Sequence, residues 1–312
     1  MPFETIGSPL LWAGFVGFVL IMLAVDLGVF HRHTHAVSLK EAAGWSAAWI
    51  TLAAIFNVGV YFLFGPERAL EFTAGYLLEK ALAVDNIFVF VVVFSTFAVP
   101  PIYQHRVLYW GVLGALIMRA AFILAGGAFL QRFHWAMYVF GGVLALTGLK
   151  LLFQREAEPH PENNPVLRWL RRVLPVTGEL HGDRFWVVKA GRRFATPLLL
   201  ALVAVEITDL IFAVDSIPAI FAITTDPFIV FTSNIFAILG LRSLYFLLAG
   251  VIDKFIYLKV GLAFVLLFVG AKMLLLDVVH IPIAASLGVI AGILGVSIAA
   301  SLLRAPRDPP AA

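Results

Sequence analysis

The sequence predicts an all-α polytopic membrane protein with nine transmembrane helices. Hydrophobic residues make up 62% of the 312 residues and charged residues only 13%, whereas soluble domains average about 25% charged residues. Mean hydropathy is +0.98, and nine apolar segments reach the length of about 20 residues that a helix needs to cross a bilayer. A polar motif inside these segments occurs twice, which indicates two related units. Nothing in the composition indicates nucleic-acid binding.

The chain contains no cysteine. Disulfides, thiolate metal sites and cysteine nucleophiles are therefore excluded. Residues 1–9 carry no lysine or arginine, so the first apolar segment lacks the positive start of a signal peptide and is predicted to remain as a helix.

Two of the apolar segments carry the polar motif and are candidates for broken or bent helices. These are the third and the sixth, and Pro218 in the sixth removes one hydrogen bond and frees the carbonyl of residue 214. Such carbonyls line ion sites in transporters. The nine segments are 9–30, 43–64, 70–98, 107–130, 135–153, 195–224, 229–250, 257–276 and 280–303.

The distribution of positive charge predicts the orientation. With the N-terminus outside, cytoplasmic segments hold 15 lysines and arginines and the opposite loops hold two, Arg68 and Arg132. This asymmetry follows the positive-inside rule and places the C-terminus in the cytoplasm. The long basic loop 154–194 suits the inner leaflet surface and is expected to be a solvated connector.

The repeated motif reads YLLEKALAVDNIFVF at residues 76–90 and EITDLIFAVDSIPAI at residues 206–220. Aligning Asp85 with Asp215 gives an offset of 130 residues and places Glu79 on Asp209. An ionisable residue at membrane depth is costly, so two matched copies predict a functional site.

The repeat extends into the following segments, where Arg119 corresponds to Arg242 and Lys150 to Lys272. Each unit then has three helices, and because three is odd the two units enter the membrane from opposite sides. This inverted repeat places the site at the midplane between the units. The predicted division is a two-helix segment 1–65, repeat 1 at 70–153, the loop 154–194, repeat 2 at 195–276, a last helix 280–303 and a tail 304–312.

The segments contain carboxylates and cations in nearly equal numbers. There are six acids and five cations. An isolated charge at membrane depth costs at least about 2.5 kcal/mol, so pairing of opposite charges must offset much of this cost. The acids are Asp26, Glu79, Asp85, Glu206, Asp209 and Asp215; the cations are Lys80, Arg119, Lys150, Arg242 and Lys272.

The spacing of the acids separates their predicted roles. Glu79 and Asp85 are six residues apart, which places them about 120° apart on a straight helix. We therefore expect Asp85 and Asp215 to face each other at the centre, with Glu79 and Asp209 nearer the two mouths. Glu206 and Asp209 are three residues apart and share a face.

These side chains are hard oxygen donors, which suit Mn²⁺, Mg²⁺ or Ca²⁺. Protonation of the same carboxylates would weaken metal binding, so coupling of transport to protons is a natural hypothesis. The predicted ligands are Asp85, Asn86, Asp215, Ser216, Glu79, Asp209 and Glu206.

The competing interpretation is that the acids only pair with cations to hold helices together. Arg119 and Arg242 are favoured as helix-locking partners, and Lys80 as another supporting cation. Lys150 and Lys272 lie near segment ends, where long cationic side chains reach the interface.

The end of the first segment carries weaker signals. Asp26 is either an interfacial charge or a ligand on an access path. His31, His33 and His35 could collect metal at the cytoplasmic mouth, although a solvated loop is the favoured interpretation.

The chain resembles the TerC family of integral membrane proteins, and in particular its Alx-type branch. The resemblance rests on TAGYLLEKALAVDNIFVF at 73–90, VEITDLIFAVDSIPAIFAITTDPFIVFTSNIFAILGLRSLYFLLAG at 205–250 and HIPIAASLGV at 280–289, and it runs from about residue 5 to 303. It implies manganese efflux. Relatives often have serines where this chain has Ala81 and Ala83, so those positions should not be essential for binding here.

The sequence thus leads to a secondary transporter, not an enzyme, that exports Mn²⁺ across the bacterial inner membrane, with Mn²⁺ as transported ion and no permanently bound cofactor. A membrane protein that senses Mn²⁺ or delivers it to exported proteins is the alternative. The sequence also leaves undecided whether the protein is a channel and whether it forms a homo-oligomer. An intramembrane hydrolase with paired aspartates is disfavoured, because the acids recur with the symmetry of an inverted repeat.

Overall fold

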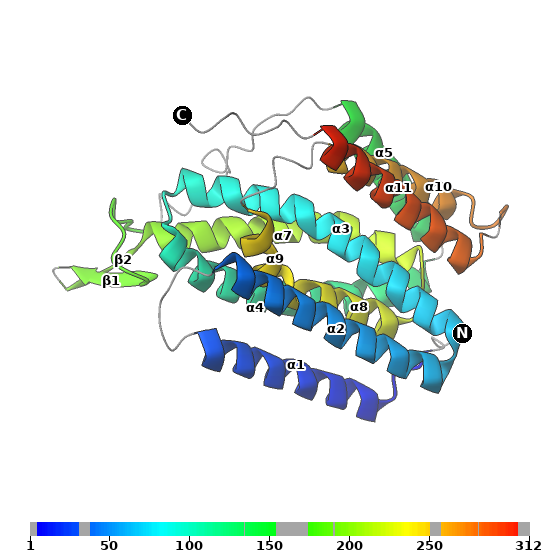
Figure 1. Cartoon of the computed structure of the whole chain (residues 1–312), viewed down its shortest axis with the longest axis horizontal. Coiled ribbons are helices and arrows are strands. Elements are labelled where there is room, and N and C mark those ends of the chain that lie inside the picture. The colour runs from blue at the N-terminus through cyan, green and yellow to red at the C-terminus, as the bar shows by residue number, and fades with distance from the viewer. Residues whose placement is uncertain are drawn as a thin grey trace.

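The computed structural model is an elongated helical bundle whose helices run mostly along its long axis (Figure 1). It describes residues 5–30, 38–133, 135–153, 174–189, 191–249, 257–279 and 281–304, without the side chains of 26–30, 85, 88, 131 and 215. The helices are α1 (Pro9–Phe30), α2 (Leu39–Phe64), α3 (Pro66–Thr96), α4 (Pro101–Arg132), α5 (Ala136–Phe153), α7 (Pro197–Phe221), α8 (Pro227–Leu239), α9 (Leu241–Leu248), α10 (Leu258–Leu274) and α11 (Ile283–Arg304); the strands are β1 (Trp186–Lys189) and β2 (Arg192–Ala195).

Each of the nine predicted apolar segments contains helix. Within the described residues, five helices are long and apolar enough to span a membrane, namely α2, α4, α5, α7 and α11, and the bent pair α8–α9 would make a sixth. The chain is therefore a polytopic membrane protein, and the count of nine spans stays a prediction.

Neither the third nor the sixth segment is broken, because α3 and α7 are each one continuous helix; a bend in either helix stays a prediction. Pro218 lies in the last turn of α7, which ends at Phe221, and the helix continues through it. The break falls in the seventh segment instead, at Gly240, where α8 and α9 meet at 42°. Lys80 stabilises this break, since its Nζ donates to the carbonyl of Ala237, 3.0 Å away, in the last turn of α8.

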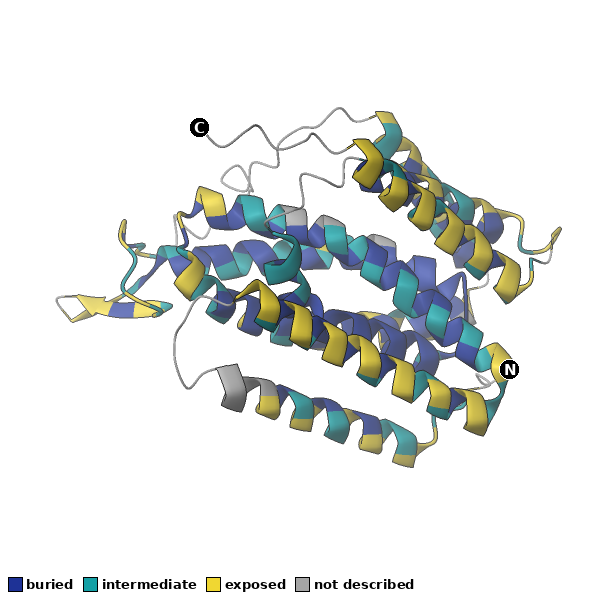
Figure 2. Ribbon diagram, in the orientation of Figure 1, coloured by how far each residue is buried: buried dark blue, intermediate teal, exposed yellow. Residues whose placement is uncertain are grey.

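The centre of the bundle consists of α3, α4, α7 and α8. Helix α3 packs on α8, α4 packs on α7, and α3 also contacts α7. Every residue of α8 from Phe228 to Leu239 is buried, whereas α1, α2 and α11 carry exposed residues along their outer sides (Figure 2).

The remaining helices flank this centre. Helices α5 and α10 form a tight pair, with α11 against α10 and α3. Glycines permit the close approach of α5 and α10, because a Cβ at Gly270 would lie 2.7 Å from the carbonyl oxygen of Gly141. Helix α1 lies at the edge of the bundle (Figure 1) and is held by aromatic contacts, such as Trp12 with Phe228 at 5.2 Å between ring centroids.

The end of the predicted connector 154–194 forms an antiparallel hairpin, β1 with β2, that the sequence did not predict. It projects from the end of the bundle where α7 begins (Figure 1). Arg106 at the start of α4 pairs with Asp183 and lies over the Phe185 ring, 5.0 Å from its centroid. These contacts attach the base of the hairpin to the helices.

Candidate functional site

Three deeply buried charges meet at Arg119, which is 1% exposed. Arg119 projects from α4 and pairs with Glu79 of α3 and Asp209 of α7. Its Nη2 lies 2.8 Å from Asp209 Oδ1 and its Nε lies 3.2 Å from Oδ2. This bidentate pairing fixes the orientation of the guanidinium plane. One cation thus joins the two helices that carry the repeated motif.

Three polar side chains complete what we call the central cluster. Asn86 Nδ2 lies 3.4 Å from Asp209 Oδ1. Arg119 Nη1 lies 3.5 Å from Ser216 Oγ and 3.4 Å from Asn234 Oδ1, at the long limit of a hydrogen bond. The cluster comprises Glu79, Asn86, Arg119, Asp209, Ser216 and Asn234, all of them buried.

The helical period explains why these residues meet. Glu79 and Asn86 are seven residues apart, as are Asp209 and Ser216, and seven residues fall only about 20° short of two helical turns. Each pair therefore shares one helix face. Glu79 and Asp209 also lie near the middle of α3 and α7, so the expectation that they sit nearer opposite mouths is wrong.

The central cluster contains polar atoms without partners. Within the described residues, Glu79 Oε2, Asn86 Oδ1 and Asn234 Nδ2 are buried and have no hydrogen bond. A buried unsatisfied polar atom costs about 1–3 kcal/mol. Two of the three are oxygens on the same face of α3, and oxygen is the ligand that a hard cation prefers.

Several predicted site residues lie outside the described residues. These are the side chains of Asp85, Asp215 and Asp26, and His31, His33 and His35 in full. Among the residues that the structure does describe, no group of three or more histidine or acidic side chains could hold a metal by itself. The predicted meeting of Asp85 with Asp215 stays a prediction.

Glu206 lies beside the cluster rather than in it. Its half-buried side chain rests against Gly114 of α4, where an added Cβ would overlap the carboxylate. Glu206 and Asp209 lie about one turn apart along α7. Gly114 therefore makes the space that this carboxylate fills.

The other predicted cations occupy different environments. Arg242 is buried in α9, just after the break at Gly240. Lys150 and Lys272 lie in the last turns of α5 and α10, where positive charge is favourable to the helix dipole. Lys150 is exposed and Lys272 is buried.

A second polar cluster, which we call the N-terminal cluster, was missed by sequence reasoning. Arg68 Nη1 lies 2.9 Å from Glu71 Oε2, which also accepts from Thr224 Oγ1 at 2.8 Å. Asp226 accepts from Phe228 N at the start of α8 and from Thr5 and Ile6, each at 2.9 Å. The cluster comprises Thr5, Ile6, Arg68, Glu71, Thr224 and Asp226.

Local signals could have identified Asp226 and Glu71 of this cluster, and also Asn234 of the central cluster. Asp226 precedes Pro227, the pattern of a helix N-cap followed by proline at the first helical position. Glu71 is a seventh acid inside the predicted segments, and Asn234 is a single amide in an apolar run.

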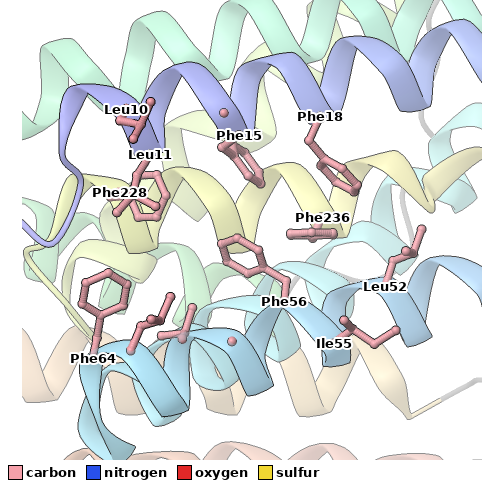
Figure 3. A pocket seen from close by; sticks show the side chains of 14 residues that line it. Leu10, Leu11, Phe15, Phe18, Leu52, Ile55, Phe56, Phe64, Phe228 and Phe236 are labelled. Carbon is pink, nitrogen blue, oxygen red and sulfur yellow. The ribbon is translucent and has the colours of Figure 1, made fainter.

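An apolar pocket is separate from both clusters. It has a volume of about 370 Å³ and lies between α1, α2 and α8 (Figure 3). Phe15, Phe56 and Phe236 contribute rings to its wall (Figure 3). Its lining has no ionisable side chain, so this pocket does not suit an ion.

Comparison with known proteins agrees with the membrane character of the chain. A family model described as "Integral membrane protein TerC family" matches residues 64–308. No solved structure matches the chain.

Curated relatives are similar over nearly their whole length. An "Uncharacterized membrane protein STKORF319" of Myxococcus xanthus is 60% identical over 307 residues, covering 98% of this chain and 96% of the relative. The "Putative membrane-bound redox modulator Alx" of Salmonella typhi is 52% identical, covering 95% of this chain and 94% of the relative. The Escherichia coli K12 protein of the same name is 51% identical, covering 93% and 94%.

Proposed function

The chain belongs to the TerC family of integral membrane proteins, and from that premise we propose that it is a secondary transporter for Mn²⁺. It exports the ion across the bacterial inner membrane through the central cluster, in exchange for protons. Mn²⁺ is the cargo and not a resident cofactor.

One observation carries this proposal: the central cluster is a buried, oxygen-rich site with a formal charge of minus one and two oxygens that have no partner among the described residues. Carboxylate, amide and hydroxyl oxygens are the ligands of Mn²⁺, Mg²⁺ and Ca²⁺. Asp85 and Asp215 are sequence neighbours of Asn86 and Ser216, so two further carboxylates are close along the chain. In a purely structural ion pair, buried oxygens without a hydrogen bond would only reduce stability.

The packing of the helices supports alternating access around this site. If the two three-helix units are related by an inverted repeat, α3 corresponds to α7, and α4 to the pair α8–α9. The symmetry that relates the two units then maps the contact of α3 with α8 onto a contact of α7 with α4. Both contacts are present and extensive. The central cluster draws side chains from these same four helices.

The Salmonella typhi and Escherichia coli relatives carry a name that refers to redox modulation. The present chain has no cysteine, so thiol–disulfide exchange by its own side chains is excluded. Under our proposal, any redox role of this protein would be indirect and would follow from the metal that it moves.

The direct test is flux of Mn²⁺ into liposomes that contain only the purified protein. We expect saturable uptake that increases when a pH gradient is imposed in the favourable direction. Absence of flux, with Mn²⁺ binding retained, would favour the alternative role in metal sensing or delivery. Flux that does not change with the pH gradient would contradict the proposed coupling to protons.

A matched pair of substitutions on α3 tests the site. Glu79→Gln removes a charge from the central cluster and should lower flux at least about tenfold, because loss of the charge weakens cation binding by about 1.4 kcal/mol or more. Glu71→Gln removes a charge from the N-terminal cluster and should leave flux within about twofold. Equal effects of the two variants would contradict the site.

A cellular assay extends the test to the aspartates whose side chains are not described. Under manganese stress, cells with Asp85→Ala or Asp215→Ala should accumulate more manganese than cells with the wild-type protein. Unchanged accumulation with normal membrane expression would remove these residues from the site.

A further inference from the structure

We propose that the Arg119 guanidinium occupies the cation position of the transport site, and that an entering divalent cation displaces it. This inference rests on the proposed function and concerns how Arg119 partly neutralises the two buried carboxylates when no ion is bound. Arg119 is then a tethered competitor of the cargo and not only a link between helices.

The geometry of the ion pairs is the first support. The guanidinium has Asp209 on one edge, held at 2.8 and 3.2 Å, and Glu79 on another. A bridging metal ion would have the same two carboxylates as neighbours. Because Arg119 is only 1% exposed, this position is closed to solvent in this state.

Charge balance is the second support. The two carboxylates and the guanidinium sum to minus one. Adding a divalent cation while Arg119 stays would leave an excess positive charge in a buried site, which is unfavourable. Removing the guanidinium from the carboxylates as the ion arrives leaves the ion and the two carboxylates neutral.

The unsatisfied oxygens are the third support. Glu79 Oε2 and Asn86 Oδ1 have no donor among the described residues while Arg119 is in place. A guanidinium offers donors only in its own plane, whereas a metal ion draws ligands from several directions. The cluster therefore has more oxygen ligands than Arg119 can satisfy.

The structure also offers the displaced side chain a place to go. Ser216 Oγ and Asn234 Oδ1 lie 3.5 and 3.4 Å from Nη1, just far enough to be weak partners in this state. A small swing away from the carboxylates would make Ser216 of α7 and Asn234 of α8 the main acceptors of Arg119. That swing would couple occupancy of the site to the packing of α8 on α3 and α4.

The test measures Mn²⁺ binding to the purified full-length protein, by electron paramagnetic resonance of free Mn²⁺, together with thermal unfolding. Arg119→Gln removes the competitor and should bind Mn²⁺ at least tenfold more tightly than wild type. It should unfold several degrees lower without metal, because two buried carboxylates lose their partner, and Mn²⁺ should raise its unfolding temperature more than it raises that of wild type. Arg119 as a simple lock predicts lost stability that Mn²⁺ does not restore.

Two further variants keep the inference decidable. Arg119→Lys retains the charge but loses the bidentate pairing with Asp209, and should bind Mn²⁺ with intermediate affinity. This variant replaces Arg119→Gln in the test if Arg119→Gln does not fold. The double variant Glu79→Gln with Asp209→Asn should bind Mn²⁺ at least tenfold more weakly than wild type.

The outcomes separate the two proposals. If the wild type binds Mn²⁺ and the Arg119 variants bind it no more tightly, the displacement inference is overturned and the transport site stands. If neither the wild type nor any variant binds Mn²⁺, the proposed function itself fails.

Discussion

The central cluster and the N-terminal cluster share helix α3 but differ in how completely their polar atoms are paired. In the N-terminal cluster both carboxylate oxygens of Glu71 and both of Asp226 accept hydrogen bonds. In the central cluster Glu79 Oε2 and Asn86 Oδ1 accept none from the described residues.

Under our proposal, this difference separates a structural site from a functional one. Full pairing minimises the cost of burying charge, as expected of a cluster that holds the starts of α3 and α8 to the N-terminal segment. Unsatisfied oxygens are tolerated where a ligand will later pair with them. Removal of a group should therefore reduce stability in the first cluster and ion binding in the second.

The largest expected effect is on stability, in the N-terminal cluster. Asp226→Ala removes the N-cap of α8 and leaves the Thr5 and Ile6 donors without their acceptor, so the free energy of unfolding should fall by about 3 kcal/mol. Denaturant titration of the purified protein measures this. Affinity for Mn²⁺ should stay within about twofold, and a large loss of affinity would mean that the two clusters are not independent.

The next effect is on binding, in the central cluster. Asn86→Ala removes an unsatisfied oxygen and should weaken Mn²⁺ binding about tenfold, or 1.4 kcal/mol. Asn86→Asp keeps an oxygen at this position and should bind at least as tightly as wild type. Titration of both variants with Mn²⁺ checks the assignment, which fails if Asn86→Ala retains wild-type affinity.

A smaller effect is expected at the edge of the central cluster. Gly114→Ala places a Cβ where the Glu206 carboxylate lies, and the shift should reduce Mn²⁺ flux about fivefold, or about 1 kcal/mol. Gly126→Ala is the matched control on the same helix, because its Cβ meets only Phe221 at 3.7 Å. If both variants transport alike, Glu206 does not need its present position.

The smallest effect is expected in the apolar pocket of Figure 3. Nothing lies within 4 Å of a Cβ at Gly59, so Gly59→Ala should stabilise α2 by about 0.5–1 kcal/mol through helix propensity alone. Flux should not change. A clear loss of flux would show that the ion path involves this pocket and would weaken the contrast between the two clusters.

The sequence predicted much of the fold and part of the site. All nine apolar segments contain helix because hydrophobicity over about 20 residues is a local property. Glu79, Asn86, Asp209, Ser216 and Arg119 were identified because polar groups are rare in such segments. Their arrangement was less accessible: six-residue spacing drew attention to Asp85 and Asp215, whereas seven-residue spacing is what places Glu79 with Asn86 on one face.

The sequence by itself determined that this is a polytopic membrane protein of the TerC family with a duplicated acidic motif. Composition and motifs are properties of the linear sequence, so they can be recognised without knowing which residues are in contact. Only the tertiary structure decided that Arg119, rather than Arg242, bridges Glu79 and Asp209, and that Asn234 joins them from α8. These choices depend on which helices pack together, and the contacts in question join side chains 40 to 123 positions apart.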